Sequence, residues 1–469
     1  MTGTVVGEDR DVRAAVEYAR AHLECAREDR HIPGLSACVV YQGEMLWAGG
    51  YGFADVAQGR AAEAGTVYPL ASITKVVTCS ALMRLRDEEK LQLDDPLSRF
   101  IQPFPVQKPS ADTPDPTLRQ IAAHIAGFQR ETPFDAWETL VFPGIEELLA
   151  ALPEVKLVFP PLTQYKYSNL AYALLAHVVE LMTGRAYPEY VATELLGPLG
   201  MTSSAFEPQG ELLERVVTRY PWCDEAGAGE PGPPFRMGCF HGVGGLCGSV
   251  EDIARFAAWH LGYPPEGAEG LLARASAREM QRPQWLQPDN SGGHAIGWGW
   301  GKTAGRFTVG HSGGIPGLST DLRLVPELEL ATAVFTNGGG MASEVNTEVL
   351  EIMVPAVARA RKRREPQRPR KGAVAPAEWS AYVGKYESTI SNQELEVHLI
   401  DGELLVRVVG TRLADTVRLE PAGAHAFVLK GGASEGDEAL FELDEAGQAT
   451  KLSLGGYPYQ RPAEESQAS

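Results

Sequence analysis

Pro69-Leu-Ala-Ser-Ile-Thr-Lys75 decides the fold of this 469-residue chain, because it places a serine and a lysine three residues apart at the start of a helix. The apolar residues that follow, up to Leu85, recur at helical spacing without a proline or glycine among them. Ser72 and Lys75 are therefore predicted to share one helix face. Ser72 would lie at the helix N-terminus, where unpaired N–H groups favour developing negative charge.

This pair of residues has the chemistry of an activated nucleophile. A serine hydroxyl is a weak nucleophile until a neighbouring base takes its proton. Lys75 can be that base if burial or nearby cations lower its pKa from about 10.4. The motif alone also occurs by chance, and its ordinary interpretation is a helix start with an exposed lysine, so the other motifs of the chain must decide.

A second motif, Tyr167-Ser-Asn169, lies between a proline-bounded loop and a predicted apolar helix. The Tyr167 phenol, next to an ammonium group, can carry the proton of a nucleophile to a leaving group. Asn169 offers both a donor and an acceptor, to a substrate amide or to Lys75. Taken by itself, this motif would more simply be a buried tyrosine packed under a helix.

A third motif, His311-Ser312-Gly313-Gly314, follows the start of a predicted strand. Its small residues would let a substrate approach the backbone. Backbone N–H groups at such an edge can stabilise a tetrahedral oxyanion, typically by about 3 kcal/mol per donor. The alternative for a glycine-rich strand is a simple β-bulge.

Charge and composition exclude several other functions. The net charge of -19 would repel nucleic acid and anionic membranes. No segment is long and apolar enough to span a membrane, and the N-terminus does not read as a signal peptide, so we expect a cytoplasmic protein. The six cysteines contain no C-x-x-C pair, which predicts reduced thiols. We expect neither a metal nor another cofactor.

The order of the predicted elements indicates two domains and a linker. In residues 1–358, helices dominate the middle and strands lie at both ends, which predicts an α+β fold: an antiparallel sheet flanked by helices, with an all-helical subdomain. Residues 359–375 are basic and contain prolines; a nucleic-acid-binding segment is the alternative to the solvated linker that we favour. Short strands at regular spacing make residues 376–469 a small all-β domain.

Three local predictions are specific enough to test. Gly49-Gly-Tyr-Gly52 should form a turn, residues 117–126 a helix that stops at Gly127, and residues 342–358 the last helix of the first domain. Residues 207–248 are rich in glycine and proline and lack clear elements, which is typical of a binding or lid region.

Together, the three motifs resemble those of the serine β-lactamase and penicillin-binding-protein superfamily, in particular its class C β-lactamase, D-peptidase and family VIII carboxylesterase branch. Ser72-Ile-Thr-Lys75 matches S-x-x-K, Tyr167-Ser-Asn169 matches Y-x-N, and His311-Ser-Gly313 stands where K-T-G occurs in the parent pattern. The resemblance covers about residues 10–358, while residues 376–462 resemble the lipocalin-like barrel of some of these proteins.

The resemblance implies a role for each residue. Ser72 would become acylated, and Lys75 and Tyr167 would share the acid and base work. Asn169 would bind Lys75 and the substrate, with His311, Ser312 and Gly313 also contacting substrate. The backbone N–H groups of Ser72 and Gly314 would form the oxyanion hole. His311 would replace a lysine that binds the carboxylate of a β-lactam. Because an imidazole binds a carboxylate less firmly than an ammonium group does, we expect weak or no β-lactamase activity.

Three functions remain open at this point. The first is a serine hydrolase (an esterase or peptidase) acting on small esters or on amides and peptides, those with D-residues included. The second is a stand-alone acyltransferase or peptide cyclase that uses the same acyl-enzyme. The third is a non-catalytic scaffold on the same fold. The partner in the first two is a small-molecule ester or peptide, and the oligomeric state is open, a homo-oligomer included.

Overall fold

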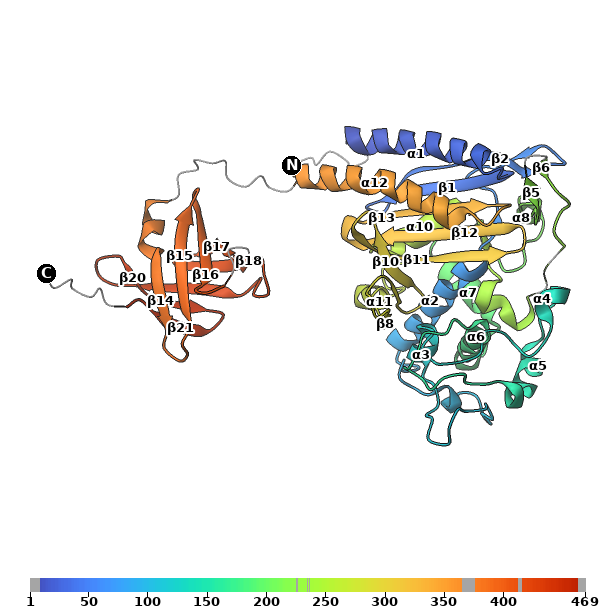
Figure 1. Ribbon diagram of the computed structural model, residues 1–469, viewed down its shortest axis with the longest axis horizontal. Helices are drawn as coiled ribbons and strands as arrows, with labels where there is room; N and C mark the ends of the chain where they lie inside the picture. The colour runs from blue at the N-terminus through green and yellow to red at the C-terminus, as the bar shows by residue number, and fades with distance from the viewer. Residues whose placement is uncertain are drawn as a thin grey trace. The chain divides into compact units, whose positions relative to one another are not determined.

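A computed structural model describes residues 9–224, 227–233, 235, 237–364, 376–411 and 416–462. The chain divides into two compact units, Met1–Lys362 and Arg363–Ser469 (Figure 1). No helix in these described ranges is long and apolar enough to cross a membrane. Each unit has its own hydrophobic core, and each is described separately below.

The first unit is built on one antiparallel sheet of nine strands in the order β3-β2-β1-β13-β12-β11-β10-β9-β8. The strands are β1 Gly34–Tyr41, β2 Glu44–Asp55, β3 Arg60–Ala61, β8 Trp285–Leu286, β9 Gly293–His294, β10 Gly299–Thr303, β11 Arg306–Ile315, β12 Leu318–Val325 and β13 Leu330–Thr336. Because β1 pairs directly with β13, both ends of this unit contribute to the sheet, and the predicted fold class is confirmed. Four further short strands form two separate pairs, β4 Tyr68–Pro69 with β7 Cys247–Gly248 and β5 Cys223–Asp224 with β6 Gly227–Ala228.

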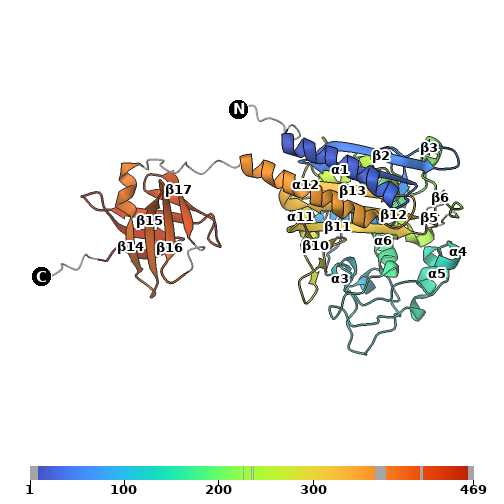
Figure 2. The same cartoon turned by 45° about the horizontal axis from the view of Figure 1, so that its top comes forward.

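Helices cover both faces of this sheet, which is why every residue of β1 is buried. Helices α1 Arg10–Asp29 and α12 Ala342–Arg364 lie side by side on one face (Figures 1 and 2). Val39 belongs to the core beneath them, whereas its neighbour Val40 belongs to the core on the opposite face. Successive strand residues point to opposite faces, so one strand supplies both cores.

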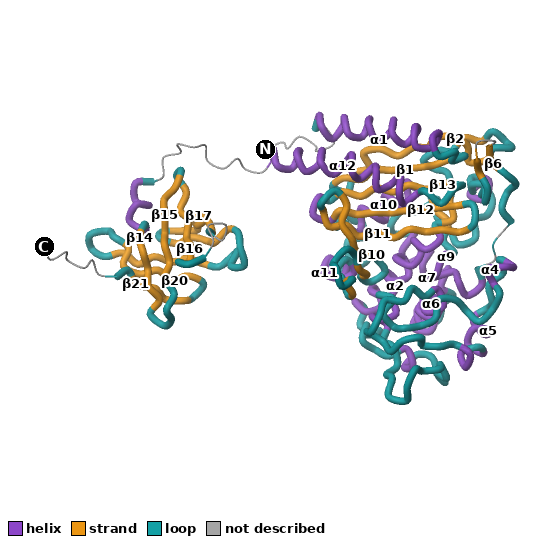
Figure 3. Tube along the Cα trace, in the orientation of Figure 1, coloured by secondary structure: helices purple, strands orange, loops and turns teal. Residues whose placement is uncertain are grey.

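The opposite face carries the helical part of the unit, seen in purple in Figure 3. Its central helix, α6, is preceded by a loop and ends at Gly184, which takes the left-handed conformation with φ of 66°. The helices of this part are α2 Thr74–Asp87, α3 Leu118–Ala122, α4 Ala136–Thr139, α5 Ile145–Ala150, α6 Asn169–Thr183, α7 Tyr187–Val191, α8 Glu211–Glu214, α9 His241–Gly244, α10 Val250–His260 and α11 Arg274–Met280.

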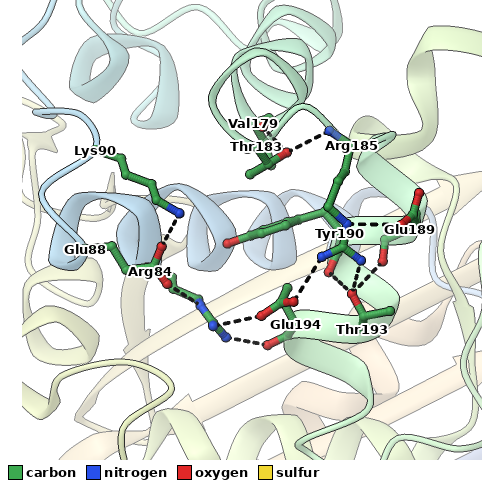
Figure 4. A network of polar contacts seen from close by, with 10 residues as sticks. All are labelled: Arg84, Glu88, Lys90, Val179, Thr183, Arg185, Glu189, Tyr190, Thr193 and Glu194. Carbon is green, nitrogen blue, oxygen red and sulfur yellow. Dashed lines mark hydrogen bonds and ion pairs between the residues drawn. The ribbon is translucent and has the colours of Figure 1, made fainter.

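A polar network fixes the C-terminal half of α2 to the segment after α7 (Figure 4). The Glu194 carboxylate lies between two guanidinium groups, 2.9 Å from Arg84 and 3.0 Å from Arg185. Arg84 also donates a hydrogen bond of 2.7 Å to the Glu194 carbonyl. Lys75 lies at the other end of α2 and Ser72 in the turn directly before it, so this network helps to set the position of the helix that carries Lys75.

Three local predictions were wrong. Residues 49–52 form no turn but lie inside β2, because the missing side chain of Gly50 leaves room for the Ala62 carbonyl, 2.4 Å from where a Cβ would be. Helix α3 ends at Ala122 rather than at Gly127, because His124 adopts φ of 58° and leaves the helix. The last helix continues to Arg364, so residues 359–364 of the predicted linker are helical; residues 365–375 lie outside the described residues.

The second unit is a closed barrel of eight antiparallel strands, which confirms the predicted barrel. The strands are β14 Gly384–Ser388, β15 Glu394–Ile400, β16 Glu403–Val408, β17 Val417–Gly423, β18 Ala426–Lys430, β19 Glu438–Leu443, β20 Ala449–Leu454 and β21 Tyr457–Gln460. A short 3₁₀ helix, Ala377–Tyr382, precedes them and packs the Tyr382 ring against Phe427 and Phe441 in the barrel core.

Candidate active site

Ser72 lies in a 3₁₀ turn, Ala71–Ile73, that leads directly into α2. Leu70, two residues before Ser72, is fixed at both of its backbone groups. Its N–H donates to the Leu246 carbonyl at 2.8 Å, and its carbonyl accepts from the Thr320 hydroxyl at 2.9 Å. Ala71 then takes φ of 47°, an uncommon value for a residue with a Cβ. The serine is thus held by β12 on one side and by the segment after α9 on the other.

Lys75 is completely buried beside this serine. Its Nζ lies 3.0 Å from the Ser72 Oγ and donates to the Val243 carbonyl at 2.9 Å. Burial lowers the pKa of Lys75 to about 7; the positive charge of Arg130 also lowers it, whereas the negative charge of Glu131 raises it. The lowered pKa makes the neutral amine, which can accept a proton, accessible near neutral pH.

Tyr167 approaches the same pair of residues from the loop before α6. Burial raises the pKa of Tyr167 to about 12, although a hydrogen bond with the Ser72 side chain acts in the opposite direction. The Lys75 Nζ lies 5.0 Å from the centre of the Tyr167 ring, and the His124 ring packs against Tyr167 with the ring centres 4.2 Å apart and the planes tilted by 30°. The phenol is therefore neutral at pH 7 and in contact with the serine hydroxyl.

Asn169 is the first residue of α6, whose N-terminus is capped by the Ser168 side chain. The Asn169 Nδ2 donates to the Glu131 Oε1 at 2.7 Å, and no described residue hydrogen-bonds to the buried Asn169 Oδ1. The expected hydrogen bond to Lys75 is absent from the described residues. The Asn169 NH₂ group points toward the Glu131 carboxylate. Glu131 lies outside the Tyr167-Ser-Asn169 motif, so the motif does not predict this contact.

The predicted glycine-rich edge, His311 to Gly314, belongs to β11 and lies against the serine turn. A Cβ on Gly313 would be 2.3 Å from the Leu70 carbonyl oxygen, so only glycine permits this approach. The His311 Nδ1 lies 2.7 Å from the Ser312 carbonyl, and burial is the main cause that lowers the pKa of His311 to about 3. His311 is therefore a neutral imidazole that donates from Nδ1 and leaves Nε2 as an acceptor.

All these motifs line a single cavity of about 890 Å³, within the size range of small-molecule sites. Of the predicted site residues, Ser72, Tyr167, Asn169, His311, Ser312, Gly313 and Gly314 line the cavity, and Lys75 lies directly behind Ser72. Sequence reasoning missed the other side chains of the wall: Arg130, Trp137, Phe142, Tyr165, Phe235, Met237, Phe240 and His294. The alternation of Tyr165 and Tyr167 is a usable signal, whereas the remainder come from segments far apart in the chain that carry no motif.

No group of three or more metal-ligating side chains occurs in the ranges that the structure describes. The reactive groups of the cavity are thus a serine hydroxyl, an amine of lowered pKa, a neutral phenol and a neutral imidazole. This set can carry nucleophilic and acid–base chemistry.

Comparison with known proteins agrees with this geometry. The β-lactamase family model matches residues 19–352, and the chain belongs to the beta-lactamase family. It is 27% identical over 377 residues to penicillin-binding protein 4 of Amycolatopsis lactamdurans, covering 78% of this chain and 96% of that protein. It is 25% identical over 328 residues to a D-aminopeptidase of Cereibacter sphaeroides, covering 68% of this chain and 59% of that one.

The fold itself recurs among solved structures. The octameric penicillin-binding protein homologue from Pyrococcus abyssi superposes with a TM-score of 0.62 at 22% identity, covering 95% of this chain and 99% of that chain. A class C β-lactamase from Rhodobacter sphaeroides gives a TM-score of 0.59 at 18% identity and covers 72% of this chain. These structures show the fold, and the family match together with the relatives places the chain among the serine hydrolases with a β-lactamase fold.

Proposed function

We propose that this protein is a serine hydrolase that acts through an acyl-enzyme on small carboxylic esters and on amides, D-aminoacyl amides included. The observation that carries the proposal is the buried Lys75 Nζ, 3.0 Å from the Ser72 Oγ. A neutral amine at this distance can take the hydroxyl proton as the oxygen attacks a carbonyl. The similarity to a D-aminopeptidase supports the inclusion of D-residues.

Each residue has a defined part in the proposed reaction. Lys75 accepts the proton of Ser72 while the Ser72 oxygen bonds to the carbonyl carbon, and the backbone N–H groups of Ser72 and Gly314 receive the oxyanion. Tyr167 gives its proton to the leaving oxygen or nitrogen, the acyl–leaving-group bond breaks, and the Lys75 ammonium returns a proton to the phenolate. Water then attacks the acyl carbon while Lys75 accepts its proton. The bond from the acyl carbon to the Ser72 oxygen breaks, Tyr167 gives its proton to that oxygen, and the Lys75 ammonium restores the phenol.

The state of His311 bears on which substrates are used. A neutral imidazole has no charge with which to hold the carboxylate of a β-lactam. The lowered pKa of His311 therefore supports weak or no β-lactamase activity, compared with activity on uncharged esters and amides.

The test is active-site labelling. A fluorophosphonate probe and the esters p-nitrophenyl acetate and p-nitrophenyl butyrate are offered to the wild-type protein, to Ser72→Ala and to a matched control, Ser80→Ala. Ser80 lies on the same helix but hydrogen-bonds to the Val76 carbonyl and His260, away from the cavity. We expect labelling and turnover in the wild type and in Ser80→Ala, and neither in Ser72→Ala.

The same experiment distinguishes the other functions. Absence of labelling in the wild type would refute the hydrolase and favour a scaffold. Labelling followed by faster product release when amines are added would favour acyl transfer to an amine over hydrolysis. A panel of D-aminoacyl p-nitroanilides and a chromogenic cephalosporin, assayed alongside, ranks the amide and β-lactam substrates.

A further inference from the structure

The cavity has two chemically different ends along strand β11. The strand passes the serine turn at Gly313, with His311 on one side of that contact and Ile315 on the other. At about 3.4 Å per residue, His311 and Ile315 are about 14 Å apart. Elements at the two ends also lie on opposite sides of α6: β8 to β10 on the left and α4 on the right in Figure 1.

The first end, which we call the histidine end, consists of His311, His294, Tyr165 and Tyr167. The Tyr167 and His311 rings lie 6.3 Å apart, and Tyr165 stacks on His294 at 4.0 Å with an angle of 10°. These side chains offer hydroxyl and imidazole groups to a ligand. In the proposed mechanism this end also holds the proton donor, Tyr167.

The second end, which we call the aromatic end, consists of Trp137, Phe142, Phe235, Met237 and Phe240. Its rings contact one another in sequence: Phe142 with Phe240 at 4.5 Å, Trp137 with Phe142 at 5.1 Å, and Trp137 with Phe235 at 6.3 Å. These contacts form a continuous apolar wall from two separate segments of the chain, residues 137–142 and 235–240.

The aromatic end is tied to the far end of β11 and to the serine turn. The Arg219 guanidinium lies 4.7 Å from the centre of the Phe235 ring and donates to the Pro316 carbonyl at 2.6 Å. On the other side, Gly244 lies between Met237 and the serine turn. A Cβ on Gly244 would be 3.5 Å from the Met237 Cε and 3.5 Å from the Ala71 Cα. The wall therefore begins beside Ser72 and extends away from the histidine end.

We propose that the aromatic end binds the acyl part of the substrate and selects esters and amides whose acyl group carries an aromatic ring. The proposal rests on the proposed function. A leaving group must contact its proton donor, so it occupies the histidine end with Tyr167, and the acyl chain must extend the other way. Trp137 is 40% exposed in this wall, so a bound ring would remove apolar surface from water and gain aromatic contacts.

A pair of isomeric esters tests the direction of the substrate. Ethyl phenylacetate carries its phenyl ring on the acyl side, whereas 2-phenylethyl acetate carries the same ring on the alcohol side, and both release an alkyl alcohol. Each kcat/KM is divided by the rate constant of hydroxide hydrolysis of that ester. We expect ethyl phenylacetate to be favoured by about tenfold or more, the usual size of discrimination by an apolar pocket.

Variants of the aromatic end test whether its side chains cause the preference for ethyl phenylacetate. Trp137→Ala and Phe235→Ala should move the ratio of the two esters toward one. Phe53→Ala is the matched control, because Phe53 is also exposed, at 46%, but lies on β2 and does not line the cavity. This variant should keep the wild-type ratio.

The outcomes separate the two proposals. A ratio of one or below in the wild type, with hydrolysis that requires Ser72, overturns the acyl subsite and leaves the hydrolase intact. A tenfold ratio that Trp137→Ala and Phe235→Ala do not change also overturns it. Absence of any Ser72-dependent hydrolysis of either ester overturns the proposed function itself.

Discussion

The charges of Arg130 and Glu131 should tune the base of this site in opposite directions. Burial lowers the pKa of Lys75 to about 7, with Arg130 lowering it further and Glu131 raising it. If neutral Lys75 is the base, kcat/KM must rise with pH through that pKa and then level off. Arg130→Gln removes a cation, so the midpoint should move to higher pH; Glu131→Gln removes an anion, so the midpoint should move to lower pH.

The size of the shift follows from distances in the site. The Lys75 Nζ lies 5.0 Å and the Arg130 Cζ 5.2 Å from the centre of the Tyr167 ring, so the two cations are no more than about 10 Å apart. At about 10 Å two unit charges interact by about 0.4 kcal/mol in water and about 1.7 kcal/mol at an effective dielectric constant of 20. This corresponds to about 0.3 to 1.2 pH units, and because the Arg130 side chain is 63% exposed we expect the lower half of that range.

The assay is the pH profile of kcat/KM for a p-nitrophenyl ester from pH 5 to pH 9.5. In the wild type, kcat/KM should rise about tenfold from pH 6 to pH 8, compared with about a hundredfold for a lysine of ordinary pKa. An upward shift of about 0.5 pH unit in Arg130→Gln would lower kcat/KM about threefold at pH 6 relative to its own plateau. Glutamine at position 131 keeps an acceptor for the Asn169 amide, which hydrogen-bonds to the Glu131 Oε1 at 2.7 Å.

Normalising each profile to its plateau separates a changed pKa from a general loss of activity. The double variant Arg130→Gln/Glu131→Gln should return close to the wild-type midpoint, and both single shifts should shrink at 1 M salt. If the two single variants move the midpoint in the same direction, or if kcat/KM keeps rising tenfold per pH unit above pH 8, Lys75 is not the group that titrates.

Four further predictions concern the site and its support. Tyr167→Phe should slow acylation by about 10²-fold or more, measured by the single-turnover rate, and a rate near that of the wild type would remove Tyr167 from proton transfer. Thr320→Val removes the hydroxyl that donates to the Leu70 carbonyl, which then keeps only the Ile73 N–H at 3.2 Å, and should lower the free energy of unfolding by about 1 kcal/mol. Thr332→Val should cost less in the same urea titration, because the buried Thr332 hydroxyl has no hydrogen-bond partner in the described part of the chain. Glu194→Ala should cost about 1 kcal/mol in such a titration, because it breaks the link between α2 and the segment after α7, and equal stability would show that the network is energetically neutral. Deletion of residues 372–469 should leave kcat/KM for small esters unchanged, because the barrel has its own core, and an altered substrate range would contradict that expectation.

The amino-acid sequence alone predicted the chemistry that is local to a motif. The three-residue spacing of Ser72 and Lys75 at a helix start predicted that their side chains lie together, and they are 3.0 Å apart. Periodicity is a local property, so it also predicted the types of the elements: the sheet built from both ends of the first unit and the all-β second unit were confirmed. The closed barrel, which the family resemblance implied, was confirmed as well. The missed details were glycines needed for a close approach, as at Gly50, and backbone conformations such as that of His124, which depend on distant neighbours.

Only the tertiary structure decided the protonation states and the shape of the cavity. Burial, which no short sequence window contains, lowers the pKa of Lys75 and raises that of Tyr167. The hydrogen bond of Asn169 to Glu131 in place of Lys75, and the wall formed by Trp137, Phe235 and their neighbours, join residues far apart along the chain. The sequence shows which chemical groups are present. The electrostatic environment of these groups and the cavity that holds a substrate form only when the chain packs.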